Sequence, residues 1–205
     1  MVPSVSGGFI TSSTADPTTD APAATDERRA VDAVLAGDRD AFRVLVDRHS
    51  AAVIRACHRV LGDIHEAEDA AQEAFVTAFR SLAGWRADGP FAAWLTRIAV
   101  RIALRRAQKR RDVTWIDPTD PDRPIDLPGG LDPAVTSLRA ERAADVRAAV
   151  ARLDEPYRET VALRFFADLS LDEIATATGR PLGTVKTHLH RGLIRLRGVV
   201  QGSAT

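Results

Sequence analysis

Apolar side chains recur at every third or fourth position through residues 26–111, which is the spacing of the buried face of an α-helix. Helix start and stop signals divide this stretch. Asp38 and Asp63 are favoured helix N-caps, Gly62 ends a helix, and the turn at residues 88–90 (Asp-Gly-Pro) precedes another helix. We therefore predict three long helices. Their predicted core side chains are Phe42, Leu45, Val46, Val53, Ile54, Leu61, Ala67, Ala70, Ala71, Ala74, Phe75, Phe79, Phe91, Trp94, Leu95, Ile98 and Ile102.

Two short helices joined by a tight turn are predicted near the C-terminal end. Ser170 and Glu173 form an S-x-x-E capping box, in which each side chain accepts a hydrogen bond from the backbone N–H of the other residue. Gly179 suits the left-handed end of that helix, and Pro181 suits the first turn of the next one. The second helix carries an apolar stripe of Val185, Leu189 and Leu196.

The polar face of this second helix is suited to nucleic acid. The chain contains no Asp or Glu after Glu173, so the helix can approach phosphate groups without repulsion. This is the layout of a helix-turn-helix whose second helix enters the DNA major groove. The residues predicted on the polar face are Thr184, Lys186, Thr187, His188, Arg191 and Arg195.

Composition divides the 205 residues into segments. Residues 1–25 are rich in Ser, Thr, Ala, Pro and Asp, which predicts a disordered tail. Residues 112–133 alternate Asp with Pro, which predicts an extended acidic linker. We therefore expect an all-α protein with two small helical bundles, at residues 26–111 and 134–199, and a short C-terminal tail at residues 200–205.

The charges are separated into blocks, although the formal net charge is zero. The stretch between Arg59 and Arg80 contains Asp and Glu but no Lys or Arg, whereas the stretch from Arg97 to Arg111 is basic and contains no acid. This separation suggests that different faces bind different partners. The basic stretch is either a solvated helix face or a row of phosphate-binding arginines, because guanidinium groups bind phosphate oxygens in pairs.

The acidic stretch allows three interpretations. Acids near a helix start interact favourably with the helix dipole. A metal site, or a hydrolase built on His65, Glu66, Glu68 and Asp69, would need a recognised ligand spacing, which the sequence lacks. The third interpretation is a protein-docking face, whose members lie at helical offsets of three and four and are Asp69, Gln72 and Glu73.

Other classes of protein are disfavoured. The single cysteine, Cys57, excludes an internal disulfide framework and fits a reducing compartment. No apolar run approaches the length of a bilayer span, and the N-terminus lacks the regions of a secretion signal. The sequence has no nucleophile–base pair, phosphate loop or metal motif. We therefore expect a cytoplasmic protein that is not an enzyme and has no cofactor, bound metal or membrane segment.

Several motifs resemble the bacterial sigma-70 family. Residues 40–42 (Asp-Ala-Phe), 67–75 (AEDAAQEAF) and 91–99 (FAAWLTRIA) resemble region 2 of that family, and residues 163–170 and 183–191 resemble its region 4. Since only these two regions and a short acidic linker are present, the chain resembles the extracytoplasmic function (ECF) group of RNA polymerase sigma factors.

The resemblance implies that the two regions bind different parts of RNA polymerase and of promoter DNA. Region 2 would dock on the β′ clamp helices of core RNA polymerase through Asp69, Gln72 and Glu73. It would also hold the −10 element of promoter DNA, with flipped bases entering a pocket between the turn before Pro90 and the following helix. Region 4 would sit on the β flap and read the −35 element, and an anti-sigma protein would bind the chain. The implied −10 contacts are Trp94, Arg97, Arg101 and Arg105, and the implied −35 contacts are Thr184, Lys186, Thr187, His188 and Arg191.

The chain departs from the family pattern at four positions that affect base preference. Pro90 stands where Ser is common, Arg101 where Asn is common, and His188 where Arg is common. The family commonly has Arg-Ala-Arg at the positions of residues 191–193, and this chain ends that run with Leu193. The promoter sequence therefore cannot be copied from relatives.

The alternative is a DNA-binding regulator of the LuxR type, whose helix-turn-helix has a similar Thr-Val-Lys-Thr-His-Leu pattern. Such a regulator would carry an α/β receiver or ligand-sensing domain over residues 26–111. Only helices are predicted there, so a sigma factor is the favoured interpretation.

Overall fold

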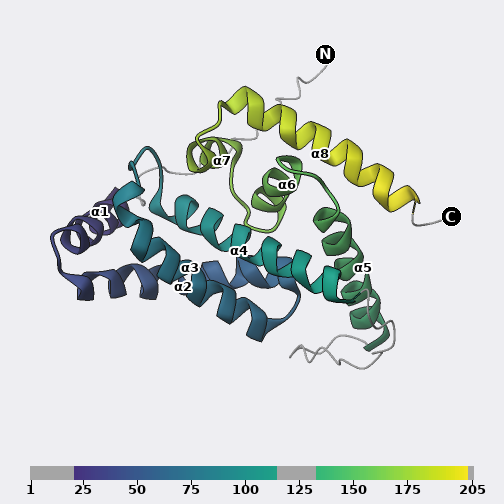
Figure 1. The fold of residues 1–205 in the computed structure, drawn as a ribbon, viewed down its shortest axis with the longest axis horizontal. Helices are drawn as coiled ribbons and strands as arrows, with labels where there is room; N and C mark the ends of the chain where they lie inside the picture. The colour runs from purple at the N-terminus through teal and green to yellow at the C-terminus, as the bar shows by residue number, and fades with distance from the viewer. Residues whose placement is uncertain (1–20, 115–132, 203–205) are drawn as a thin grey trace, which may run out of the picture.

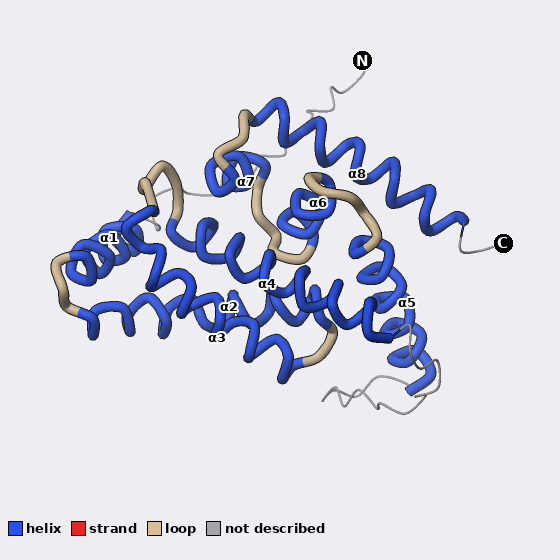
Figure 2. Tube along the Cα trace, in the orientation of Figure 1, coloured by secondary structure: helices blue, strands red, loops and turns tan. Residues whose placement is uncertain are grey.

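The computed structural model describes residues 21–114 and 133–202, and within these ranges the chain forms helices and no strands (Figures 1 and 2). This confirms the predicted all-α fold class. The α-helices are α1 (Ala21–Leu35), α2 (Phe42–Leu61), α3 (Ile64–Ser81), α4 (Phe91–Thr114), α5 (Pro133–Ala151), α6 (Tyr157–Phe165), α7 (Leu171–Thr178) and α8 (Leu182–Gly202). Short 3-10 turns at Arg39–Ala41 and Leu82–Gly84 precede α2 and follow α3.

Three predicted boundaries differ from the structure. Helix α1 begins at Ala21, inside the predicted tail, and α4 runs to Thr114, inside the predicted linker. Helix α5 begins at Pro133, which is the last residue of the predicted linker. The remainder of the predicted tail and linker, residues 1–20 and 115–132, lies outside the described residues.

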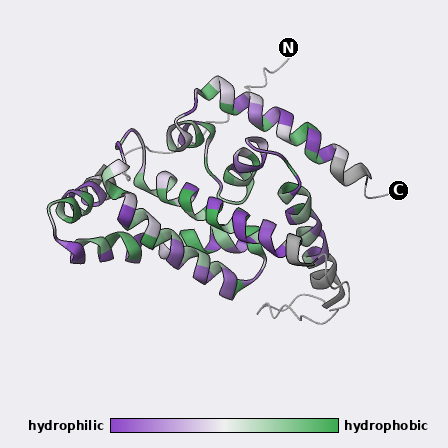
Figure 3. Cartoon of the chain, viewed as in Figure 1, coloured by the Kyte–Doolittle hydropathy of each residue, from purple (hydrophilic) through white to green (hydrophobic). Residues whose placement is uncertain are grey.

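Helices α1 to α4 form the first bundle. The face of α3 that packs between α2 and α4 is built from alanines, which let the neighbouring helices approach closely: Ala67, Ala70, Ala71, Ala74 and Ala78. Leu45 and Val53 from α2 and Leu95 and Val100 from α4 fill the remaining core and are almost fully buried. Figure 3 shows hydrophobic and hydrophilic residues alternating along these helices, as expected of amphipathic elements around one core.

Local capping explains where the helices of the first bundle begin and end. Asp63 caps α3 by accepting the Glu66 N–H at 2.9 Å. Asp38 accepts the backbone N–H groups of Asp40 and Ala41, so it caps the 3-10 turn that leads into α2 rather than α2 itself. Gly62 ends α2 with a φ of 78°, a left-handed conformation that costs a residue with a Cβ atom about 1–2 kcal/mol.

Helices α5 to α8 form the second bundle, which contains the predicted helix-turn-helix in α7 and α8. The capping box is present, with Ser170 Oγ accepting the Glu173 N–H and Glu173 Oε2 accepting the Ser170 N–H. Gly179 takes the predicted left-handed conformation. Gly192 lies where α8 crosses α6, since a Cβ atom there would lie 2.8 Å from Val161 Cγ2.

The second bundle lies against α4. Helices α6 and α7 both contact α4 on one side and α8 on the other (Figure 1). Helix α8 therefore lies on the outer side of the second bundle, away from the first bundle. By contrast, Arg97 and Arg101, in the N-terminal half of α4, face α6.

Replacing Gly62 with Ala should destabilise the protein by about 1–2 kcal/mol, because the backbone there is left-handed. The new Cβ would also lie 2.8 Å from the guanidinium carbon of Arg147. Urea denaturation followed by circular dichroism measures the change in the free energy of unfolding. Gly84→Ala is the matched control, since its Cβ would meet no atom within 4 Å. Equal stability of the two variants would contradict this role for Gly62.

Candidate nucleic-acid interface

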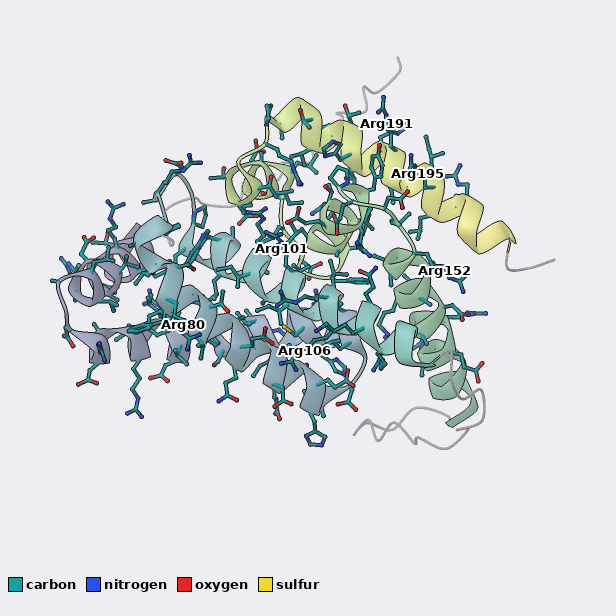
Figure 4. All side chains as sticks on the ribbon, viewed as in Figure 1. Arg80, Arg101, Arg106, Arg152, Arg191 and Arg195 are labelled. Atoms are coloured by element: carbon teal, nitrogen blue, oxygen red, sulfur yellow. The ribbon has the colours of Figure 1, made fainter. Side chains whose placement is uncertain are left out.

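The centre of the basic face of α4 surrounds one buried acid, Glu159 of α6. Arg97 Nε donates to Glu159 Oε1 at 2.9 Å, and Arg101 Nε lies 3.8 Å from the same oxygen. On the other side, Arg180 Nη1 lies 3.0 Å from Glu159 Oε2. Glu159 is 5% exposed, so its charge is separated from water and neutralised by arginines of both bundles. Figure 4 shows Arg101 on α4 between the two bundles.

The electrostatics keep this carboxylate ionised. Burial disfavours the charged form and would raise the pKa of Glu159, but the charges of Arg97, Arg180 and Arg101 and the hydrogen bond from Arg97 outweigh it. The net result is a pKa below the ordinary glutamate value. Glu155 accepts the Glu159 backbone N–H and is the other acid beside the site.

Further polar contacts join the bundles on either side of Glu159. Arg59 of α2 donates to the backbone carbonyl of Phe166 at 3.2 Å and pairs with the carboxylate of Asp168. Arg158 of α6 donates to the side-chain oxygen of Gln108 on α4 at 3.0 Å. The contact of Arg158 and the Glu159 cluster therefore join α6 to α4, and the contacts of Arg59 join α2 to the segment that follows α6.

A cavity of about 270 Å³ lies at the N-terminal end of α4, between the two bundles. The first bundle contributes the loop at residues 84–90 and the side chains of Trp94 and Arg97, and the second bundle contributes residues 176–179. The ring of Trp94 is half-buried and lies 5.5 Å from that of Phe91, so Trp94 belongs to both the core and the cavity wall. Arg97 Nη1 donates to the Ala177 carbonyl at 3.0 Å, which brings α7 over the cavity.

The C-terminal half of the basic stretch binds the acidic helix of its own bundle. Arg105 and Arg106 both pair with Glu73, at 3.1 and 2.7 Å, and Arg110 pairs with Glu66 at 3.0 Å. The charge blocks therefore neutralise each other in part, and the expectation that each block serves a separate partner is wrong for these pairs. Arg105, an expected −10 contact, pairs with Glu73 while its side chain stays 61% exposed.

The three residues of the predicted docking face differ in their surroundings. Asp69 and Gln72 are exposed on α3, whereas Glu73 is half-buried by its pairs with Arg105 and Arg106. Val76, one turn beyond Gln72, is 44% exposed and extends this face with an apolar side chain. The sequence pattern did not single out Val76.

The predicted DNA-reading residues lie together on α8. Lys186, Thr187 and Arg191 are exposed, and Thr184 is half-buried in the first turn. Figure 4 shows Arg191 and Arg195 on α8. Arg195 turns toward the second bundle, where it pairs with Asp154 at 3.0 Å and lies over the ring of Tyr157. Helix α8 thus presents cations and hydroxyl groups to solvent.

His188 is held differently from its neighbours on α8. It is half-buried, with its ring edge-to-face to Tyr157 of α6 at a centroid distance of 5.8 Å. Burial, followed by the charges of Arg180 and Arg191, lowers the pKa of His188. The imidazole is therefore neutral at neutral pH and can accept or donate one hydrogen bond without adding charge.

Glu66 and Glu68 of the hydrolase hypothesis lie beside basic side chains, whereas Asp69 is exposed. Glu66 pairs with Arg110, and His65 lies 3.8 Å from Glu68 on the exposed side of α3. Across residues 21–114 and 133–202, no group of three or more His, Cys, Asp or Glu side chains could hold a metal ion. In the same part of the chain, no helix is long and apolar enough to cross a membrane.

Sequence reasoning missed Glu159, the residue on which the contact between the bundles centres. Its position in the first turn of α6 looks like an ordinary favourable interaction with the helix dipole. Its partners Arg97 and Arg180 are distant in the sequence, and no local pattern marks the pairing. The only available signal was an acid at an otherwise buried helix position, flanked by Thr160, Val161 and Ala162.

Comparison with known proteins identifies both bundles. Residues 45–113 match the family model of sigma-70 region 2, and residues 143–196 match that of sigma-70 region 4. The chain is 34% identical over 178 residues to the ECF RNA polymerase sigma factor SigW of Bacillus subtilis, covering 83% of this chain and 94% of SigW. It is 35% identical over 171 residues to the RNA polymerase sigma-H factor of Pseudomonas aeruginosa, covering 80% and 89% of the two chains.

The fold is also similar to a solved structure, that of CnrH in complex with the cytosolic domain of CnrY. The TM-score is 0.55 and the sequence identity 24%, over 86% of this chain and 98% of CnrH. This likeness supports the helical fold.

The strength of the contact between the bundles should not change with pH near neutrality and should decrease in acid. The pKa of Glu159 is lowered in the packed state. Ionised Glu159 therefore stabilises the contact fully at pH values above the ordinary glutamate pKa of 4.5, and this stabilisation is lost as the pH falls below 4.5 and the carboxylate becomes protonated. Fluorescence energy transfer between labels on the two bundles measures this opening. The Glu159→Gln chain controls for other acids and should show a smaller change, so identical pH profiles would contradict the assignment.

Proposed function

The chain belongs to the ECF group of sigma-70 family RNA polymerase sigma factors, and from this membership we propose that it binds core RNA polymerase and directs it to promoters. The observation that carries the proposal is the presence of both family regions, in order, on separate bundles with separate polar faces. The first bundle is region 2, and the second bundle contains region 4. A sigma factor acts by binding and positioning, so no catalytic residue is required.

We propose that α8 reads the −35 element in the major groove. The helix-turn-helix geometry, the exposed Lys186, Thr187 and Arg191 and the neutral His188 support this role. Thr184, in the first turn, lies where the N-terminal part of a recognition helix meets base edges. The absence of acids after Glu173 keeps this face free of repulsion from phosphate.

The −10 element would bind at the N-terminal half of α4. Arg97 and Arg101 supply guanidinium groups, and the loop at residues 84–90 with Trp94 forms one side of a cavity that suits a flipped base. Arg105 supports this surface indirectly, because its charge is already paired with Glu73.

Core polymerase would dock on α3 through Asp69 and Gln72, toward the β′ clamp helices, and on region 4, toward the β flap. The exposed acid and amide can meet cationic and polar groups, and the exposed Val76 adds apolar area. Glu73 contributes by holding α3 against α4 as well as by its partial exposure. An anti-sigma protein that covers these surfaces remains the expected regulator.

The LuxR-like alternative is not favoured. Residues 26–111 would carry an α/β sensing domain in such a regulator, but their described part is helical and matches sigma-70 region 2. The helix-turn-helix alone fits a sigma factor and a LuxR-like regulator equally well, so the fold of the first bundle distinguishes the two classes.

Transcription in vitro tests the proposal directly. The purified chain, added to core polymerase and a library of promoter sequences, should produce transcripts from a subset that shares −35 and −10 elements. Failure to bind core, or binding without initiation on any template, would overturn the proposed function.

Asp69→Arg should weaken binding to core polymerase, because it reverses a charge in the centre of the exposed face of α3. A loss of about tenfold in affinity is expected for replacing a favourable charge contact by a repulsive one. The matched control is Glu68→Arg, which makes the same charge change one position earlier and about 100° around the helix. Fluorescence anisotropy of labelled protein measures both affinities. If the two variants bind core equally well, the docking face has been misplaced.

Arg191→Ala should reduce transcription from promoters that depend on the −35 element. A lost phosphate contact lowers the salt slope of DNA binding by about one, whereas a lost base contact costs about 1–3 kcal/mol at one position. Arg152→Ala removes the same charge from an exposed site outside α8 and serves as control. Transcription on paired templates with intact and scrambled −35 elements shows whether Arg191 contacts a phosphate group or a base. An equal effect of both variants would argue against recognition by α8.

A further inference from the structure

A second cavity, of about 710 Å³, lies between the two bundles beside the Glu159 cluster. The first bundle contributes one face of α4 and Thr77 of α3, and the second bundle contributes the start of α6 and Arg180 of the turn between α7 and α8. Figure 4 shows Arg101 at this place, on α4 between the bundles. Sites for small molecules commonly have volumes of roughly 300–1,000 Å³, so a ligand of that kind fits here.

Positive charge is in excess around this cavity. Glu155 pairs with Arg158 at 3.0 Å, whereas the carboxylate of Glu159 has three guanidinium groups beside it, at 2.9, 3.8 and 3.0 Å. One carboxylate cannot neutralise three guanidinium groups, so the cavity attracts anions. The charged lining residues are five arginines and two acids: Arg97, Arg101, Arg105, Arg158, Arg180, Glu155 and Glu159.

Three of the arginines keep hydrogen-bond donors for a ligand. Arg101 Nε lies 3.8 Å from Glu159, which is too far for a hydrogen bond, and the Arg101 side chain is 63% exposed. Arg105 donates from Nη2 to Glu73 and stays 61% exposed. Arg180 Nη1 is buried and has no hydrogen-bond partner within the described residues, although it lies 3.0 Å from Glu159. A buried N–H group without an acceptor is costly, so an anion that accepts from it binds favourably.

The placement of these donors suits two adjacent phosphate groups. Arg101 and Arg105 are one helical turn apart, so they share one face of α4, and both line the cavity. Arg180 comes from the second bundle and lies beside the other oxygen of Glu159. Guanidinium groups bind phosphate oxygens in pairs. A diphosphate can therefore occupy both arginines of α4 and still present an oxygen to Arg180.

The cavity also has an apolar side. Ile98 and Ile102, again one helical turn apart, line it together with Leu104. An inorganic diphosphate would fill a small part of the volume and leave these side chains in contact with water. An organic group joined to the phosphates would cover them, which is favourable in proportion to the apolar area removed from water. Thr77 and Gln108 add a hydroxyl and an amide that can orient such a group by hydrogen bonds.

We propose that this cavity binds a small organic diphosphate, of the class of the nucleoside diphosphates. Its phosphate groups would lie on Arg101, Arg105 and Arg180, and its organic group would lie against Ile98 and Ile102. The inference is independent of the promoter-binding function proposed above, since the ligand is a small molecule held by residues of both bundles. Arg180 separates this site from a nucleic-acid surface on α4 alone.

Isothermal titration calorimetry on the full chain, in buffer without divalent cations, tests the proposal with three probes. Inorganic pyrophosphate should bind at least about tenfold more tightly than inorganic phosphate, because it makes additional charge-assisted hydrogen bonds. Adenosine diphosphate should bind at least about threefold more tightly than pyrophosphate, because its organic group covers the isoleucines. The inference is overturned if adenosine diphosphate shows no saturable binding at millimolar concentrations, or binds no more tightly than pyrophosphate.

Single substitutions locate the site. Arg101→Gln in the first bundle and Arg180→Gln in the second should each weaken binding of adenosine diphosphate about tenfold. Arg152→Gln removes the same charge from an exposed position on α5, outside the cavity, and should leave the affinity unchanged. Equal losses in all three variants would mean non-specific attraction and would overturn the site. A loss in Arg101→Gln without one in Arg180→Gln would place the anion on α4 alone and would overturn it too.

A second variant at position 180 covers the structural role of this arginine. Since Arg180 pairs with buried Glu159, circular dichroism must show that Arg180→Gln is folded. If it is not, Arg180→Lys decides, because lysine keeps the charge beside Glu159 but lacks the paired donors of a guanidinium group. Folded Arg180→Lys should bind adenosine diphosphate at least about threefold more weakly, and an unchanged affinity would overturn the inference. Transcription is not measured in these titrations, so their failure leaves the proposed function untouched.

Discussion

The arrangement of the described chain depends on the neutralisation of one buried carboxylate. Glu159 is charged and almost fully enclosed, a state that is costly unless opposite charges and hydrogen bonds replace the lost water. Arg97 and Arg101 from the first bundle and Arg180 from the second supply them. Separating the bundles takes Glu159 away from the α4 arginines and exposes all of these groups to water. These charges act beside a buried apolar cluster that includes residues of both bundles, so ion pairs and apolar packing together set the mutual position of the two regions.

Helix α4 serves three partners with three parts of its surface. Its apolar face, including Leu95 and Val100, completes the core of the first bundle. Its C-terminal arginines pair with acids of α3, and its N-terminal half carries Arg97, which pairs with Glu159 of α6. This explains how a run of cations is accommodated in a chain of zero formal net charge. The acids that balance these cations lie directly against them.

Helix α8 shows how packing shapes a recognition surface. Gly192 lets α8 approach α6 closely, and Tyr157 of α6 holds the ring of His188 from behind while Arg195 stacks over the same tyrosine at 4.4 Å. The orientation of the helix and the neutral state of His188 are thus set by the second bundle itself. The departure from the family pattern at position 188 therefore places a half-buried imidazole with a lowered pKa on this helix.

Sequence alone determined the all-α class, the helices α2, α3, α4, α7 and α8 and most of their ends, because periodicity and capping act over a few residues. The capping box at Ser170, the glycine ends at Gly62 and Gly179 and most of the core alanines follow from such local signals. Tertiary structure alone decided which charges meet. Arg97 and Glu159 are 62 positions apart, and Arg59 and Asp168 are 109 apart. Pairings over such distances depend on how the bundles dock, and no local pattern encodes that docking.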